Sequence, residues 1–327
     1  MKIIAIHDGK GGHKSQLMGV MQDFISEQVE IIQAKSSLLK YLPNFLVEHL
    51  LFLLNKKLLQ VKDPNLIITI GKTSTPYAIY LKKQYPQAKL VFLMPSGNLS
   101  KKYGDLIFYH SYKNVNYKDP KYIPILSAPH LVNKDALSKS LSEWKDEFNK
   151  YKKPIISVIL GGDAKKIHLN SAAIDDLIDE IKKIKDIVGG SVFISTSRRT
   201  GLDNELYFKK QMQEMISNGE CFFWGYNEKQ TEVKNPYLAM LANSNYVIIS
   251  GESISMISEA CSLPSNVGVY IFFSKNFSSK RYIKFHGNMY INNHAKPIKS
   301  FSANWERSSL NSTNLVVEII KNTIRSI

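Results

Sequence analysis

The sequence predicts an α/β fold made of two doubly wound, Rossmann-like domains that face each other across a cleft. The chain has 327 residues, and a length of this order favours two domains. Short apolar runs alternate with longer segments of helical periodicity, which is typical of parallel sheets covered by helices. The alternation is broken once, by the polar and charged residues 133–153. We therefore expect a first domain over 1–150, a second over 151–312, and a closing helix over 313–327 that packs back on the first.

The first series of elements starts with a buried strand, because Ile3-Ile4-Ala5-Ile6 is apolar throughout. Its strands are expected at 2–7, 29–33, 66–71, 89–94, 106–109 and 122–125, and its helices at 14–27, 36–60 and 75–84. The apolar run Phe45–Leu54 is too short to span a bilayer. It predicts either a core helix or an interfacial helix that dips into a membrane.

The second series repeats the alternation. Its strands are expected at 155–160, 192–196, 221–224, 246–250 and 267–273, and its helices at 171–187, 203–217, 236–242, 253–261 and 313–325. In the helix at 171–187 the apolar residues recur at helical spacing, and Pro236 suits the first turn of the helix that it begins. Ligands of such sheets bind beyond the carboxyl ends of the strands.

Composition narrows the class of protein. Two cysteines, Cys221 and Cys261, exclude a disulfide framework and indicate a reducing compartment, so we expect buried core thiols in the cytoplasm. The sequence has no apolar run of about 18 residues and no signal-peptide pattern, so no membrane-spanning helix is expected.

The charge is strongly positive and unevenly distributed. The net charge is +15, and residues 1–152 hold 22 basic and 12 acidic residues. Lysine bias from an AT-rich genome explains such a charge; a surface that faces anionic lipid at the inner membrane face is the alternative. Nucleic acid is not an expected partner.

The stretch DGKGGHKSQ, residues 8–16, follows the first strand and precedes the first helix. Its Gly11, Gly12 and Lys14 are candidates for phosphate binding, because glycines admit a ligand to the backbone and a helix N-terminus offers free N–H groups. The Walker pattern fails at two glycines, and the dinucleotide pattern GxGxxG fails at its third. The P-loop of partition-type ATPases needs one more residue. The alternative is a tight turn without a ligand.

Three stretches of the second series point to the same chemistry. Gly161 and Gly162 follow its first strand, and STSRRT, with Arg198 and Arg199, follows its second. Arginine pairs bidentately with phosphate, and the chain has five arginines against 38 lysines. In SGESISMISEA, Ser253 and Ser255 stand at a helix start that attracts anions, and Glu259 lies about one and two-thirds turns further on. The alternatives are an ordinary turn at Gly161 and Gly162, a solvated loop at STSRRT and an ordinary capped helix at SGESISMISEA.

Several patterns are absent. The sequence has no DxD, HExxH, HxH or GxSxG motif, so neither a metal site nor a hydrolase elbow is supported, and no cofactor is expected.

Together, DGKGGHKSQ, STSRRT and SGESISMISEA resemble bacterial relatives of the plant mitochondrial-fission family named for elongated mitochondria. The resemblance covers nearly the whole chain and implies the two-domain GT-B fold of glycosyltransferases. It implies that Arg198 pairs with the diphosphate of a nucleotide-sugar, that Ser253 and Ser255 hold it, and that Glu259 binds ribose. Gly161 and Gly162 would flank the donor, Gly11 and Gly12 would face the phosphates or the acceptor, and His13 would be the general base.

The expected function is therefore metal-independent transfer of a sugar from a nucleotide-sugar to a lipid-linked or cell-surface glycan. Two alternatives stay open. One is a non-catalytic GT-B relative that acts as an adaptor for a protein or a membrane, and the other is a P-loop-like ATPase.

Overall fold

The computed structural model describes residues 1–34, 61–113, 118–164, 167–227, 234–273 and 279–325. The chain divides into two compact units: unit 1 is Met1–Leu131 with Asn311–Ile327, and unit 2 is Val132–Leu310. Residues 132–150, which the sequence analysis assigned to the first domain, thus group with the second sheet. The apolar run Phe45–Leu54 and the helix expected at 36–60 lie outside the described residues.

Unit 1 contains a six-stranded parallel sheet in the order β2-β1-β3-β4-β5-β6. The strands are β1 (Lys2–His7), β2 (Gln28–Gln33), β3 (Leu66–Ile70), β4 (Lys89–Phe92), β5 (Leu106–His110) and β6 (Tyr122–Ile125). β1, β3 and β4 lie at the centre, and β3 is buried along its whole length. Burial on both faces explains why these strands are continuous apolar runs in the sequence.

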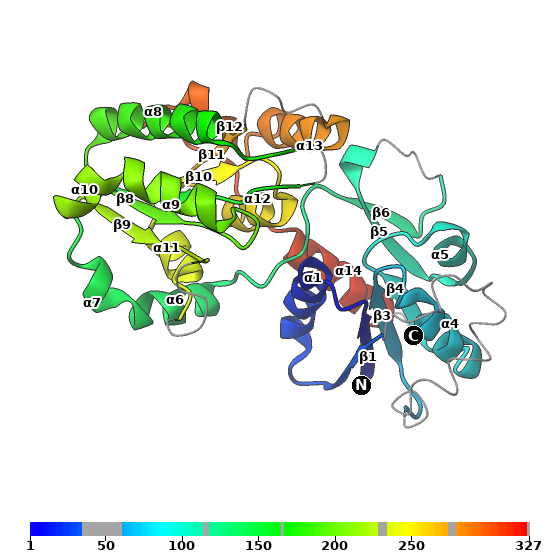
Figure 1. Cartoon of the computed structure of the whole chain (residues 1–327). Helices are drawn as coiled ribbons and strands as arrows, with labels where there is room; N and C mark the ends of the chain where they lie inside the picture. Colours follow the sequence, from blue (N-terminus) through cyan, green and yellow to red (C-terminus); the bar gives the residue numbers. More distant parts are fainter. Residues whose placement is uncertain (35–60, 114–117, 165–166, 228–233, 274–278, 326–327) are drawn as a thin grey trace. The chain divides into compact units, whose positions relative to one another are not determined.

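Helices cover both faces of this sheet (Figure 1). They are α1 (Gly11–Met21), α4 (Thr75–Gln84), α5 (Gly97–Tyr103) and α14 (Ser312–Arg325), with short 3-10 turns at Gln22–Phe24 and Ser111–Lys113. α1 and α14 pack on one face around Leu17, Val20 and Ile320, and α4 packs on the other. The start of α14 is fixed where the Ser127 hydroxyl meets that of Ser312 at 2.8 Å.

Unit 2 contains a second six-stranded parallel sheet, in the order β12-β11-β10-β7-β8-β9. The strands are β7 (Ile155–Ile159), β8 (Ser191–Ser195), β9 (Cys221–Trp224), β10 (Tyr246–Ser250), β11 (Gly268–Phe272) and β12 (Lys296–Pro297). The predicted α/β class with two Rossmann-like sheets is confirmed. The central strands β10, β7 and β8 end side by side, and this edge of the sheet carries the loops of interest.

The helices of unit 2 lie on both faces of its sheet (Figure 1). They are α6 (Lys134–Glu143), α7 (Lys145–Phe148), α8 (Ser171–Val188), α9 (Leu202–Gln211), α10 (Gln213–Ser217), α11 (Tyr237–Asn243), α12 (Ile254–Cys261) and α13 (Lys280–Ile291), with a 3-10 turn at Ile298–Ser300. The helix expected at 203–217 is divided into α9 and α10, and α5, α13 and β12 were not expected. No helix in the described part of the chain is both long and apolar enough to cross a bilayer.

Candidate functional site

Three loops of unit 2 are joined by hydrogen bonds at the carboxyl ends of β7, β8 and β10. The amide of Gly161 donates to Ser250 Oγ at 2.6 Å, and the amide of Gly162 donates to Glu252 Oε1 at 2.7 Å. The Ser197 hydroxyl donates to the Gly161 carbonyl at 3.0 Å. The loops after three adjacent strands therefore form one connected structure.

Gly162 allows these loops to approach closely. Its φ is +156°, and a Cβ at this position would overlap the carbonyl group of Arg199. Only glycine fits such a close approach between backbones. The Asp163 amide then donates to the Arg199 carbonyl at 3.0 Å, so the first and second loops also share a backbone bond.

The two adjacent arginines are used differently. Arg199 Nη2 lies 3.8 Å from Glu252 Oε1, and the Glu252 side chain is only 7% exposed. Arg199 is thus half of an internal ion pair that neutralises a buried carboxylate. Arg198 is exposed and makes no polar contact with the described residues. Its guanidinium group is therefore available to an anion.

The start of α12 is a second position for an anion in unit 2. Ser253 is the N-cap residue, yet its side chain makes no capping hydrogen bond. The first amides of α12 and the hydroxyls of Ser253 and Ser255 lie at the positive end of the helix. His286 Nε2 lies 2.7 Å from the Gly251 carbonyl oxygen. Burial lowers the pKa of His286 to about 4, although the bond to Gly251 opposes this, so we infer a neutral ring whose Nε2–H donates to that carbonyl.

Glu259 lies further along α12 and contacts α11. The Tyr237 hydroxyl donates to Glu259 Oε2. Burial raises the pKa of Glu259 to about 7, and the hydrogen bond from Tyr237 only partly offsets it. Burial and the charge of Glu259 also raise the pKa of Tyr237 well above its ordinary value. This carboxyl therefore titrates near neutral pH.

Unit 1 carries a histidine–carboxylate pair after β1. His13 Nδ1 lies 2.9 Å from Asp8 Oδ1; the Asp8 side chain is 1% exposed and that of His13 is 23% exposed. Burial acts to raise the pKa of Asp8, but the bond from His13, the charges of His13 and Lys10 and the Lys10 amide together lower it. A carboxylate at Nδ1 leaves Nε2 of the ring as the basic nitrogen.

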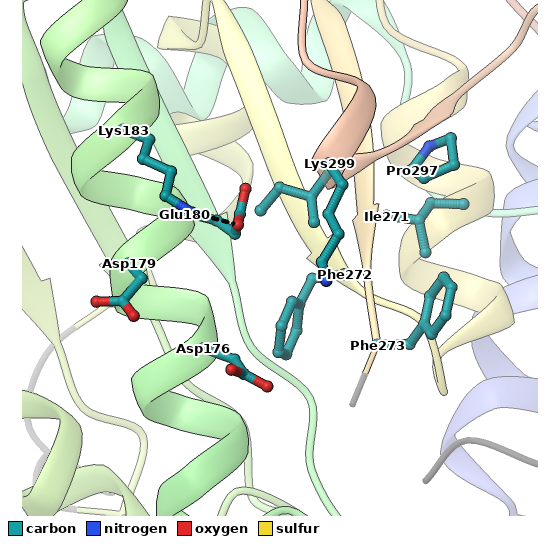
Figure 2. Close-up of a pocket in the computed structure, with 10 residues that line it drawn as sticks. Asp176, Asp179, Glu180, Lys183, Ile271, Phe272, Phe273, Pro297 and Lys299 are labelled. Atoms are coloured by element: carbon teal, nitrogen blue, oxygen red, sulfur yellow. Dashed lines mark hydrogen bonds and ion pairs between the residues drawn. The ribbon is translucent and has the colours of Figure 1, made fainter. Parts of the chain in front are cut away.

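The described part of unit 2 has a small hollow and a larger one. The small one, of about 20 Å³, is lined by Gly162, Glu252 and Phe272, among others. The larger one, of about 310 Å³, lies between α8 and β11. Figure 2 shows Asp176 pointing toward Phe272 across this hollow, whereas Asp179 turns away. The larger hollow contains none of the predicted site residues, and its rim mixes three carboxylates with two lysines. The described residues also contain no cluster that would bind a metal.

The family of the chain follows from its similarity to known proteins. Residues 11–324 match the sequence pattern of the family described as Mitochondrial fission ELM1. The chain belongs to this family. An uncharacterized protein of Rickettsia prowazekii is 29% identical in an alignment of 316 residues that covers 86% of this chain and 86% of that protein. The Mitochondrial fission protein ELM1 of Arabidopsis thaliana is 29% identical over 136 residues, 41% of this chain and 30% of the plant protein.

Solved structures share the fold of this ELM1-family protein. The UDP-GlcNAc 2-epimerase of Methanocaldococcus jannaschii has a TM-score of 0.57 and 12% identity, covering 98% of this chain and all of that one. The epimerase of Neisseria meningitidis, solved bound to UDP-GlcNAc, has a TM-score of 0.56 and 12% identity, with coverage of 98% and 100%. At this identity the likeness is one of fold: two Rossmann-like domains of the GT-B-like type.

The ELM1-family structure distributes the predicted residues over two groups. Gly161, Gly162 and Arg199 meet in unit 2, next to the loop that leads into Ser253. In unit 1, Gly11, Gly12, His13 and Lys14 form the first turn of α1, where the two glycines and Lys14 are exposed. The amides of Gly161 and Gly162 are already bonded to Ser250 and Glu252, so these glycines contribute close packing rather than free N–H groups.

Three further candidates, Asp8, Glu252 and Tyr237, were not predicted from the sequence. Asp8 lies in DGKGGHKSQ and Glu252 in SGESISMISEA, and the signal for both was an acidic residue within two positions of the end of a buried strand. Tyr237 is 22 residues before Glu259, and no local pattern connects them.

Proposed function

We propose that this ELM1-family protein binds a nucleotide-sugar through unit 2 and transfers the sugar to a hydroxyl of a lipid-linked or cell-surface glycan. The observation that carries the proposal is the exposed Arg198 guanidinium on a loop held rigid by Arg199, Glu252 and Gly162. A rigid loop presents an arginine to a diphosphate at a low entropic cost. The fold shared with an epimerase solved bound to UDP-GlcNAc supports this class of ligand.

The donor contacts follow from charge. Arg198 binds the diphosphate bidentately, and the start of α12, with Ser253 and Ser255, holds a second phosphate oxygen. Glu259 is near its pKa at neutral pH and serves as a hydrogen-bond partner for ribose hydroxyls, in competition with Tyr237. No metal is required, because an arginine and a helix N-terminus stabilise the leaving diphosphate.

In the transfer step, a residue of unit 1 accepts the proton. The acceptor hydroxyl gives its proton to His13 Nε2, its oxygen bonds to the anomeric carbon, and the bond from that carbon to the diphosphate oxygen breaks. The electron pair leaves with the nucleoside diphosphate. Asp8 stabilises the imidazolium that forms and fixes the ring orientation. Because the acceptor is lipid-linked or part of a cell-surface glycan, the proposed reaction takes place in the cytoplasm at the inner face of the membrane.

Nucleotide binding is tested by calorimetry and by thermal shift with UDP, ADP, GDP, UDP-GlcNAc and ATP. We expect one nucleoside diphosphate to bind. Arg198→Ala should weaken it by about 1.5–3 kcal/mol, the value of a hydrogen bond to a charged group. Arg325→Ala is the matched control, since Arg325 is also exposed but belongs to α14. Equal affinities in the Arg198 variant and the wild type would refute the donor site. Mg²⁺-dependent binding of ATP alone, lost in Lys14→Ala, would favour the ATPase instead.

Turnover is tested by hydrolysis of the nucleotide-sugar and by transfer to a membrane extract. His13→Gln should lower kcat by about 10²- to 10⁴-fold, the usual contribution of a general base, and leave the donor affinity unchanged. Asp8→Asn should lower kcat in the same direction and shift the pH profile. A His13 variant that transfers sugar at the wild-type rate would disprove the base assignment.

A non-catalytic adaptor is the second candidate, and one observation favours it. Two of the carboxylates near the proposed donor site already accept hydrogen bonds within the protein: Glu252 accepts one from the Gly162 amide, and Glu259 accepts one from the Tyr237 hydroxyl. An adaptor predicts that no nucleotide shifts the melting temperature, while all variants keep the fold.

A further inference from the structure

The second sheet carries a long stretch of sequence without acidic residues. Between Glu259 and Glu306 the chain has no Asp or Glu but has five Lys and one Arg. α13 lies inside this stretch. All charged side chains in and around this helix in the sequence are therefore cations, although the chain has 28 acidic residues.

α13 is amphipathic, and its outer face is both basic and apolar. Phe285, His286 and Met289 point into unit 2. Outside this buried side, five residues of the helix are exposed: Lys280, Ile283, Lys284 and Ile291 on the far side and Arg281 on the flank. Ile283 is 52% exposed and Ile291 is 84% exposed. We call these five residues the α13 face.

One further observation points to an anionic partner, and a second adds apolar surface to the same side of the helix. The three cations of the α13 face lie in the first turns of the helix, at the positive end of its dipole, and no acidic residue stands in the first turn. This placement disfavours the helix by itself, whereas an anion there interacts favourably with both the side chains and the dipole. Phe273, 44% exposed, stacks on His286 at 5.8 Å and adds apolar surface beside the helix.

We propose that the α13 face binds the surface of an anionic lipid membrane. Lysine and arginine are attracted by anionic headgroups, and exposed isoleucine and phenylalanine side chains enter the boundary of the acyl region. Two aliphatic side chains among the cations fit the acyl boundary of a membrane, whereas single-stranded nucleic acid is bound by cations combined with aromatic side chains that stack on the bases. This surface belongs to unit 2 and does not depend on sugar transfer.

The test is co-sedimentation of the full chain with vesicles of phosphatidylcholine, with and without phosphatidylglycerol. The wild type should bind the anionic vesicles and be released as NaCl rises from about 0.1 M to about 1 M. The triple variant Lys280→Gln/Arg281→Gln/Lys284→Gln should bind on the order of a hundredfold more weakly, at about fivefold per cation. Lys139→Gln/Lys182→Gln/Lys210→Gln removes the same charge from exposed sites elsewhere on unit 2 and should keep most of the binding.

The apolar part has its own pair of variants. Ile283→Ser should weaken vesicle binding several-fold, whereas Leu206→Ser, at a side chain 46% exposed on α9, should not. Unchanged melting temperatures show that the variants are folded. The proposal is overturned if the two triple variants bind equally, if the wild type binds no anionic vesicle, or if RNA competes with the vesicles and is bound through the same residues.

Discussion

Arginine is rare in this chain, with five residues, and three of them have distinct environments in the structure. Arg198 is exposed, Arg199 neutralises the buried Glu252, and Arg307 is buried among backbone carbonyls. The scarcity identified Arg198 and Arg199 in the sequence, because they are adjacent and follow a strand. No local sequence pattern pointed to Arg307, because its partners Val267 and Cys261 lie 40 and 46 residues earlier in the chain.

Only those parts of the candidate site that are formed by residues close together in the sequence could be predicted. The loops after buried strands, with their glycines and hydroxyls, can be read directly from the sequence. The pairing of Glu252 with Gly162, 90 residues away, cannot. Neither can the contact that occupies Glu259, because its partner Tyr237 belongs to another helix.

Glu259 should make stability depend on pH. Its pKa is about 7 in the fold against 4.5 ordinarily, so the folded state binds the proton more tightly. This contribution, on the order of 3 kcal/mol, is fully present below pH 4.5 and is lost as the pH rises through 7. Urea unfolding across this window should show a slope that Glu259→Gln removes and Glu306→Gln, an exposed control, retains. A slope unchanged in Glu259→Gln would contradict the burial argument.

Among the elements, the long buried ones were predictable and the short or mixed ones were not. All strands of both sheets except β12 were found, because burial on two faces requires apolar runs. β12 has only two residues and no pattern to read. α13 was not predicted, because its exposed surface carries isoleucines as well as cations, so apolar residues are not confined to the buried side.

The C-terminal end of α12 depends on Arg307. Its guanidinium donates to the carbonyls of Cys261 at 2.8 Å and Leu263 at 2.6 Å, and its Nε donates to Val267 at 2.6 Å. Arg307→Met should lower the free energy of unfolding by roughly 3 kcal/mol or more, since each buried carbonyl left without a donor costs about 1–3 kcal/mol. Arg325→Met, at an exposed site, should change it by less than about 0.5 kcal/mol. Equal unfolding midpoints in urea would disprove this role.

For the whole molecule, the chain leaves unit 1 at Leu131 and returns to it at Asn311. The sequence indicates two sheets through its repeated alternation, but the point of division depends on which sheet the polar residues 132–150 contact. α6 packs against α11 of unit 2, and the Lys234 amine meets Glu143 at 3.2 Å. Such a choice rests on long-range contacts, which composition does not reveal.

The returning helix should be essential to unit 1. Ile320 is fully buried against the sheet beside Leu17 and Val20. Ile320→Ala should cost about 2–5 kcal/mol through the cavity that it leaves. Leu315→Ala, at a side chain 43% exposed on the same helix, should cost far less. Hydrogen exchange of the β1 amides reports the effect, and equal protection in the two variants would show that α14 is dispensable.

The hydrogen bond from His286 to the Gly251 carbonyl connects α13 to the turn that precedes α12. One side chain therefore connects the helix that we propose to bind lipid with the turn before the helix that we propose to bind phosphate. If lipid displaces this histidine, nucleotide affinity changes, and thermodynamic reciprocity demands that nucleotide change lipid affinity by the same factor. With such coupling, the affinity of the protein for nucleotide would differ between the membrane-bound and the free state.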